Sequence, residues 1–222
     1  MILAEDTWAL WQKFILEKIS SMDIIPRPYP YYFVDQLFPE EMYEFMVKYW
    51  PNDKSFWGQN DIADKPLAHK EANYRKVVLM EDVGDFQIEN NGQIFWEEVK
   101  KILLGRELVE AFVDRCFEFL NKERDDLNWS KLEIWSDALL QSDQEGFQLG
   151  PHHDSRHALF SNIIYLPDIG DDIGMGTIVY KPKAEFRRKV TNIGVDYDNH
   201  YHKTDNFEEV YRAPYKENSM FG

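Results

Sequence analysis

The chain has 222 residues, of which 44% are hydrophobic and 29% are charged, as in an ordinary folded protein. Its formal net charge of −15 at pH 7 disfavours general electrostatic binding to nucleic acid or to an anionic membrane surface. No apolar run approaches the ~20 residues that a transmembrane helix needs, and the N-terminus lacks the pattern of a signal peptide. We therefore expect a cytoplasmic protein with neither nucleic-acid nor membrane partners.

The first part of the chain has the periodicity of amphipathic helices. Apolar side chains recur at helical spacing at Trp8, Trp11, Ile15 and Ile19, which predicts a helix over residues 5–20. Further helices are expected from Pro39 to Pro51, over 94–103 and over 108–120, with Gly105 between the last two, strands over 31–34 and 74–80, and a long polar loop over 52–73.

After Asn128 the sequence changes to short apolar runs separated by turn residues, which indicates strands. Helices first and strands later favour an α+β fold, with helices packed on one side of an antiparallel sandwich or barrel. No repeat or flexible linker divides the chain, so we expect a single domain over 1–222, mainly helical over 1–128 and β-rich over 129–222. The expected strands lie over 132–140, 147–149, 159–166, 177–180 and 210–215, and the segment around residues 152–154 is also expected to be a strand.

Three of the six histidines fall within residues 150–157. A His and a carboxylate two positions apart on an extended chain point to the same face, so His152 and Asp154 could offer nitrogen and oxygen to one metal ion. The neighbouring His153 would point the other way. A similar pair, His69 and Glu71, lies in the polar loop and is interpreted as a solvated surface. Because Cys116 is the single cysteine, any metal here would use His and carboxylate ligands.

The run Leu149-Gly-Pro-His-His-Asp-Ser-Arg-His157 resembles a segment of the Fe(II)/2-oxoglutarate-dependent dioxygenases, notably their prolyl-hydroxylase-like and phytanoyl-hydroxylase-like members. In that family the segment carries the first two iron ligands. Residues 160–167 and 174–180 resemble the next two strands of the family's double-stranded β-helix and their turn. The resemblance extends more loosely from Tyr32 to the C-terminus.

This resemblance implies a double-stranded β-helix (jelly-roll) and an oxygenase that hydroxylates an unactivated C–H bond of a small-molecule or peptide substrate. His152 and Asp154 would be two ligands of Fe(II), and 2-oxoglutarate and oxygen would be the cosubstrates. The closing residues 212–222 resemble the strand that leads to the family's second His ligand and its carboxylate-binding basic residue. By that comparison both lie beyond Gly222, so we expect a C-terminally incomplete chain that is inactive as an oxygenase.

Several other residues are candidates for the same site. His200 and His202 are alternative third ligands, although the sequence around them is typical of an exposed loop. For 2-oxoglutarate, the hydroxyls of Tyr165 and Thr177 and the amide of Gln148 are the candidate neutral partners.

Two other classes of function stay open. One is a cupin-like metal-binding protein on a related barrel, and the other is a non-catalytic β-barrel interaction protein. Nucleotide-binding loops are absent from the sequence, because Gly174-Met-Gly176 is too short for a dinucleotide fingerprint. Cys116 lies in an apolar helical stripe, which favours a buried, inert thiol over a nucleophile. The substrate and the oligomeric state are not indicated by the sequence.

Overall fold

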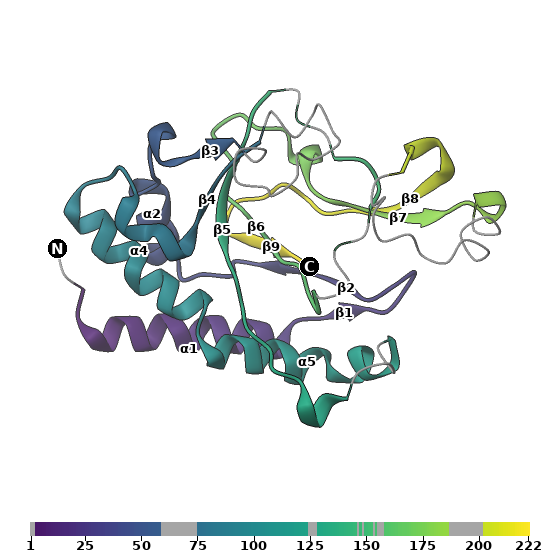
Figure 1. Cartoon of the computed structure of the whole chain (residues 1–222), viewed down its shortest axis with the longest axis horizontal. Helices are drawn as coiled ribbons and strands as arrows, with labels where there is room; N and C mark the ends of the chain where they lie inside the picture. The colour runs from purple at the N-terminus through teal and green to yellow at the C-terminus, as the bar shows by residue number, and fades with distance from the viewer. Residues whose placement is uncertain are drawn as a thin grey trace. The chain divides into compact units, whose positions relative to one another are not determined.

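The computed structural model describes residues 3–58, 75–123, 128–145, 147, 149–152, 154, 158–186 and 202–222. The fold is α+β, with helices and small antiparallel sheets, as the sequence predicts (Figure 1). Within the described residues the sheets do not close into a barrel. The chain groups into two compact units, the first formed by Met1–Ser21 and Phe38–Gln148 and the second by Met22–Leu37 and Leu149–Gly222.

These units are divided differently from the expected halves. The strand over residues 31–35 belongs to the second unit, and the strand over 139–143 belongs to the first. The division therefore does not follow the change in composition near residue 128. The expectation of a single domain stays a prediction.

The helices of the first unit lie where the apolar periodicity places them. α1 buries Trp11, Ile15 and Ile19, carries acidic residues in its first turn and a lysine in its last, and packs against α5 (Figure 1). One boundary differs from the prediction, because Pro39 has an extended ψ of 141° and caps α2 instead of starting it. The described α-helices of this unit are α1 (Glu5–Ser21), α2 (Glu40–Lys48), α4 (Asn90–Leu103) and α5 (Arg106–Glu123).

An aromatic core joins α2 to α4. Trp96 is fully buried, and its indole N–H donates a 2.6 Å hydrogen bond to the carbonyl oxygen of Tyr49, so the polar atom of this side chain is satisfied. The Trp96 ring also packs edge-on against Phe86 and Phe95. This bond fixes the C-terminal end of α2 against α4.

The sheet of the first unit has the antiparallel order β3-β4-β5, formed by Trp57–Gly58, Arg75–Leu79 and Leu139–Asp143. The predicted strand over 132–140 was placed too early, since pairing with β4 starts only where Leu139 meets Leu79. Residues 132–138 alternate between half-buried and exposed, like a strand, but are not paired in the sheet. The ladder between β4 and β5 therefore ends at Leu139, because β4 ends at Leu79.

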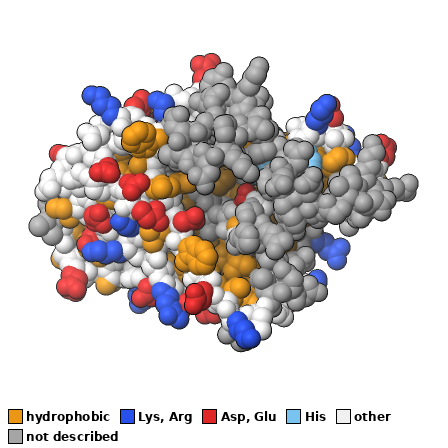
Figure 2. Space-filling model, in the orientation of Figure 1, with side chains coloured by type: hydrophobic (Ala, Val, Ile, Leu, Met, Phe, Trp, Pro, Cys, Tyr) orange, Lys and Arg blue, Asp and Glu red, His pale blue; other side chains and the backbone are white. Residues whose placement is uncertain are grey.

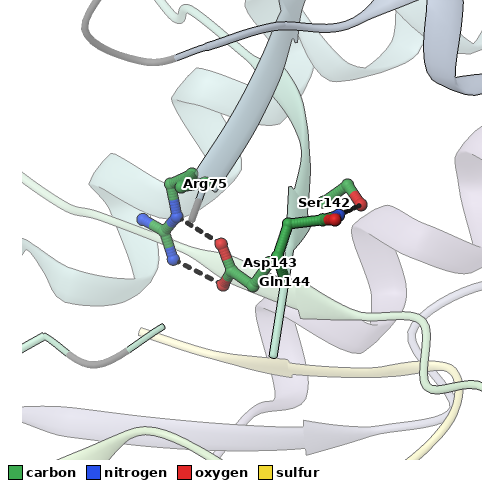
Figure 3. Close-up of polar contacts among 4 residues, drawn as sticks. All are labelled: Arg75, Ser142, Asp143 and Gln144. Carbon is green, nitrogen blue, oxygen red and sulfur yellow. Dashed lines mark hydrogen bonds and ion pairs between the residues drawn. The ribbon is translucent and has the colours of Figure 1, made fainter. Parts of the chain in front are cut away.

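One end of this ladder is closed by the ion pair between Arg75 and Asp143, which face each other across β4 and β5 (Figure 3). The guanidinium donates two hydrogen bonds to the carboxylate, from Nε at 2.5 Å and from Nη2 at 2.7 Å. Phe147 lies against the guanidinium, with its ring centroid 4.1 Å away. The Arg75 side chain is only 15% exposed, so this pair is better shielded from water than an ordinary surface ion pair.

We expect Arg75→Lys to destabilise the protein by about 1 kcal/mol, because an ammonium keeps the charge but loses both the two-bond geometry and the stacking on Phe147. Thermal unfolding measures the change. Arg106→Lys is the matched control, since Arg106 also pairs with a carboxylate at 2.6 Å but on the exposed surface of α5. An equal effect of the two substitutions would contradict the argument.

The second unit contains a four-stranded antiparallel sheet of order β1-β2-β9-β6 and the antiparallel β7-β8 hairpin. Aromatic and aliphatic side chains from both form one buried cluster that includes Tyr31, Tyr165, Val179, Ala213 and Phe221. The strands are β1 (Ile24–Ile25), β2 (Tyr31–Asp35), β6 (Ile163–Tyr165), β7 (Ile178–Pro182), β8 (Phe207–Arg212) and β9 (Ser219–Phe221).

The C-terminal strand β9 lies between β2 and β6, although its three residues are too few to show any periodicity. The chain enters it through Asn218, whose φ of 51° is in the left-handed region that asparagine tolerates better than most residues. Lys216 forms a 2.6 Å ion pair with Asp35 at the end of β2. The predicted strands over 159–166, 177–180 and 210–215 appear with shifted ends as β6, β7 and β8, whereas Phe147 and Leu149 are not in a strand.

On the face shown in Figure 2, acidic and basic side chains are interspersed over the helices on the left. Oppositely charged side chains form short-range pairs along α4, where Lys101 lies 2.6 Å from Glu98 and Lys100 lies 3.8 Å from Glu97. In the described part of the chain, every helix is too short or too polar to cross a lipid bilayer.

Candidate metal-binding site

His152 and Asp154 lie close together, as their spacing predicts. Nε2 of His152 is 3.6 Å from Oδ1 of Asp154, and the two side chains are 28% and 49% exposed. Neither residue is in a strand, so the expectation that this segment is a strand is wrong for the residues described. Their side chains meet on an irregular segment that follows Gly150-Pro151.

A local hydrogen bond sets the orientation of the imidazole. Nδ1 of His152 lies 2.8 Å from the carbonyl oxygen of Gly150. Because a carbonyl oxygen can only accept, Nδ1 carries the proton in this bond, and in the neutral ring Nε2 then keeps its lone pair. This is the arrangement by which metal-binding histidines are commonly held, with one nitrogen bonded to the protein and the other directed at the metal.

The two donor atoms fit one divalent ion. Bonds from such an ion to imidazole nitrogen and carboxylate oxygen are about 2.0–2.2 Å, and 3.6 Å is less than the sum of two of them. A neutral imidazole and a carboxylate also suit iron in a facial triad. Within the described ranges, however, no group of three or more His, Cys, Asp or Glu side chains is placed to hold a metal. The site as described supplies two ligands.

His202 lies beside this segment through its backbone. Its N–H donates a 2.8 Å hydrogen bond to the carbonyl oxygen of Pro151. The imidazole packs against two phenyl rings, with ring centroids 5.4 Å from Phe186 and 5.6 Å from Phe207. The structure therefore brings His202 to the candidate site, but does not include it in a three-ligand group. His69, His153, His157 and His200 lie outside the described residues.

Tyr165 and Thr177, the two hydroxyl candidates for 2-oxoglutarate, bind each other. The Tyr165 hydroxyl donates to Thr177 Oγ1 at 2.7 Å and accepts from the Thr177 backbone N–H at 2.9 Å. Burial raises the pKa of the Tyr165 phenol above its usual value, so the group stays protonated. Each hydroxyl keeps some capacity for another partner, and their role with 2-oxoglutarate stays a prediction. Gln148 lies outside the described residues.

We expect Tyr165→Phe to destabilise the fold by about 1–2 kcal/mol, because the part-buried Thr177 N–H loses its acceptor. Thermal unfolding checks this. Tyr180→Phe on β7 is the matched control in the same unit, since the Tyr180 hydroxyl makes no hydrogen bond to the described residues. Unchanged stability of Tyr165→Phe would mean that another group satisfies Thr177.

The Cys116 thiol lies in the apolar stripe of α5 and is buried. Burial raises its pKa from 9.0 to about 11, while the nearby Arg115 charge lowers it to a smaller extent. A thiol of this kind is almost entirely protonated at neutral pH and is a poor nucleophile. The prediction of a buried cysteine is confirmed.

A thiol reagent at pH 8 should therefore label Cys116 at least ~10-fold more slowly in the folded protein than in denaturant. The raised pKa also implies that the contribution of this thiol to the free energy of unfolding decreases as the pH rises from about 9, where the unfolded thiol ionises, to about 11, where the folded one does. In the labelling experiment, the absorbance of the released reagent group measures the rate of labelling. Equally fast labelling of the folded protein would show an accessible, reactive thiol.

Two features of the site were not predicted from the sequence. The Gly150 carbonyl as partner of His152, and the contact between Pro151 and His202, depend on backbone atoms that every residue carries. The feature of the sequence that could have indicated this close approach is Gly150 itself, where a Cβ atom would lie 3.0 Å from the His202 carbonyl oxygen.

Comparison with protein-family models, with curated proteins and with solved structures finds no match to this chain.

Proposed function

We propose that this protein is an Fe(II)/2-oxoglutarate-dependent oxygenase that hydroxylates a small-molecule or peptide substrate. The observation that carries the proposal is the pairing of His152 and Asp154, with Nε2 3.6 Å from Oδ1 and Nδ1 bound to the Gly150 carbonyl. The resemblance of residues 149–157 to the first iron-ligand segment of that family supports the same function. The double-stranded β-helix is part of this proposal.

In this proposal each residue has a defined task. His152 offers Nε2 to the metal while its Nδ1–H stays on the Gly150 carbonyl, so the ring cannot rotate away without losing a hydrogen bond. Asp154 offers a carboxylate oxygen and neutralises part of the metal charge. When bound, Fe(II), 2-oxoglutarate and O2 would supply the oxidising chemistry, in which 2-oxoglutarate is converted to succinate and carbon dioxide, one oxygen atom of O2 enters the succinate and the other hydroxylates a C–H bond of the substrate.

Metal and cosubstrate should bind cooperatively, which can be tested without knowing the substrate. A 2-keto acid chelates a metal ion through its keto and carboxylate oxygens, so 2-oxoglutarate should strengthen Mn(II) binding by at least ~3-fold, and Mn(II) should strengthen 2-oxoglutarate binding equally. Glutarate, which lacks the keto oxygen, should have no such effect. Calorimetric titration of Mn(II) in the presence of each acid measures the coupling.

Substitution of either ligand should abolish this coupling. Asp154→Asn and His152→Ala are expected to weaken Mn(II) binding at least ~10-fold. Asp171→Asn is the matched control, because Asp171 is an exposed carboxylate of the same unit that makes no ion pair with the described residues. Metal binding without any effect of 2-oxoglutarate would favour a cupin-like protein, and no metal binding would favour a non-catalytic interaction protein.

Turnover gives a further check. Two ligands hold Fe(II) less firmly than three, so succinate release by the 222-residue chain is expected to be slow. Fast release that is lost in His152→Ala would show that a residue outside the described ranges, or His202, completes the ligand set. His200 would then be tested first among the residues outside the described ranges.

A further inference from the structure

The segment that carries His152 is tied to the β7-β8 hairpin at one well-defined point. The carbonyl oxygen of Pro151 accepts a 2.8 Å hydrogen bond from the backbone N–H of His202. Pro151 is buried, whereas His152 and Asp154 next to it are exposed. The tie therefore lies at the buried end of the irregular segment, directly before the first candidate ligand.

The ring of His202 anchors this tie. It belongs to a cluster of three rings with Phe186 and Phe207, and the two phenyl centroids are 5.3 Å apart. Phe207 is the first residue of β8 and pairs with Pro182 of β7. The backbone N–H of His202 is therefore held in place by a side chain that packs against the end of the strand pair where β7 ends and β8 begins.

Further hydrogen bonds stabilise the same end of the β7-β8 strand pair. The backbone N–H of Lys183 donates to the carbonyl of Asn206 at 2.9 Å, and its ammonium donates to the carbonyl of Asp205 at 2.7 Å. The turn that carries Phe186 closes through a bond from the Phe186 N–H to the Lys183 carbonyl at 2.9 Å. These hydrogen bonds join the residues that follow β7 to those that precede β8, close in sequence to Phe186 and Phe207.

The fit around Gly150 shows how closely the two segments approach. A Cβ atom on Gly150 would lie 3.0 Å from the His202 carbonyl oxygen, a backbone atom that cannot turn aside as a side chain can. The Gly150 carbonyl is also the acceptor for Nδ1 of His152. A shift of His202 is therefore expected to disturb the residue that orients the imidazole.

We propose that His202 is a positioning residue of the metal site. Its N–H bond to Pro151 and its ring packing on Phe186 and Phe207, together called the Pro151–His202 clasp, hold Gly150 and therefore the His152 imidazole in its metal-binding orientation. The inference rests on the function proposed above, since it takes His152 and Asp154 as metal ligands. It assigns His202 a different role from that of a third ligand, in which a ring nitrogen would bind the metal.

Replacement by phenylalanine and by alanine separates the two roles. Phenylalanine keeps a flat ring between Phe186 and Phe207 but has no nitrogen donor, and alanine removes the ring. The clasp predicts that His202→Ala weakens Mn(II) binding ~10-fold while His202→Phe stays within ~3-fold of the unchanged protein. Equal losses in the two variants would overturn the clasp and favour His202 as a ligand, and no loss in either would also overturn it.

A second measurement tests the clasp in metal-free protein. The clasp predicts that in His202→Ala the backbone amide of residue 202, which donates the bond to Pro151, exchanges hydrogen at least ~10-fold faster, whereas in His202→Phe it does not. Unchanged exchange in His202→Ala would overturn the clasp whether or not metal binds. If the unchanged protein binds no Mn(II) but the two variants differ in amide exchange as predicted, the proposed function fails and the clasp stands.

A control excludes general destabilisation. Tyr29→Ala removes a ring of the same unit that is 47% exposed and far in sequence from the clasp, and it should change neither Mn(II) affinity nor amide exchange at His202. Both measurements are made well below the melting temperature of each variant. Equal effects of Tyr29→Ala and His202→Ala would show that loosening of the whole unit, and not the clasp, is responsible.

Discussion

The second unit depends on the insertion of a three-residue strand, Ser219–Phe221, between two strands that lie far apart in the sequence. This strand pairs with Tyr31–Asp35 on one side and with Ile163–Tyr165 on the other, so it joins the N-terminal part of the chain to the segment that follows the candidate ligands. All three of its residues are buried. Without this strand, β2 and β6 would each lose a neighbour and expose unpaired backbone groups.

The candidate site shows how much can be built from backbone atoms. The imidazole of His152 is oriented by the Gly150 carbonyl, and the next carbonyl, that of Pro151, is bound by the His202 N–H. Two adjacent peptide groups thus serve two purposes, one local and one that reaches the hairpin. A segment without regular secondary structure can hold ligands in place when its carbonyls are engaged in this way.

The helices could be predicted because they follow from periodicity, and the closeness of His152 to Asp154 could be predicted because the two residues are only two positions apart. The i, i+3, i+7 spacing at Trp8, Trp11 and Ile15 defines a helix wherever the rest of the chain lies. The two-residue spacing of the ligands brought their side chains together even though no strand forms there, because the bond to Gly150 turns the imidazole toward Asp154.

Other features depend on partners that are remote in sequence. The start of β5 at Leu139 is set by the length of β4, and no property of residues 132–138 indicates it. The hydrogen bonds between Tyr165 and Thr177 likewise required the placement of β6 and β7, although each residue alone was a reasonable candidate. Strand pairing and backbone hydrogen-bond acceptors depend on residues that are remote in sequence, so the local sequence does not indicate them.

The seven tryptophans are distributed unevenly, and this has a practical consequence. All of them lie in the ranges of the first unit, and none lies in Met22–Leu37 or Leu149–Gly222, where tyrosine and phenylalanine supply the aromatic side chains. Indole fluorescence excited at its red edge therefore originates from one unit only. Followed together with far-ultraviolet circular dichroism, which samples the whole backbone, it would show directly whether the two units unfold in one cooperative transition or separately.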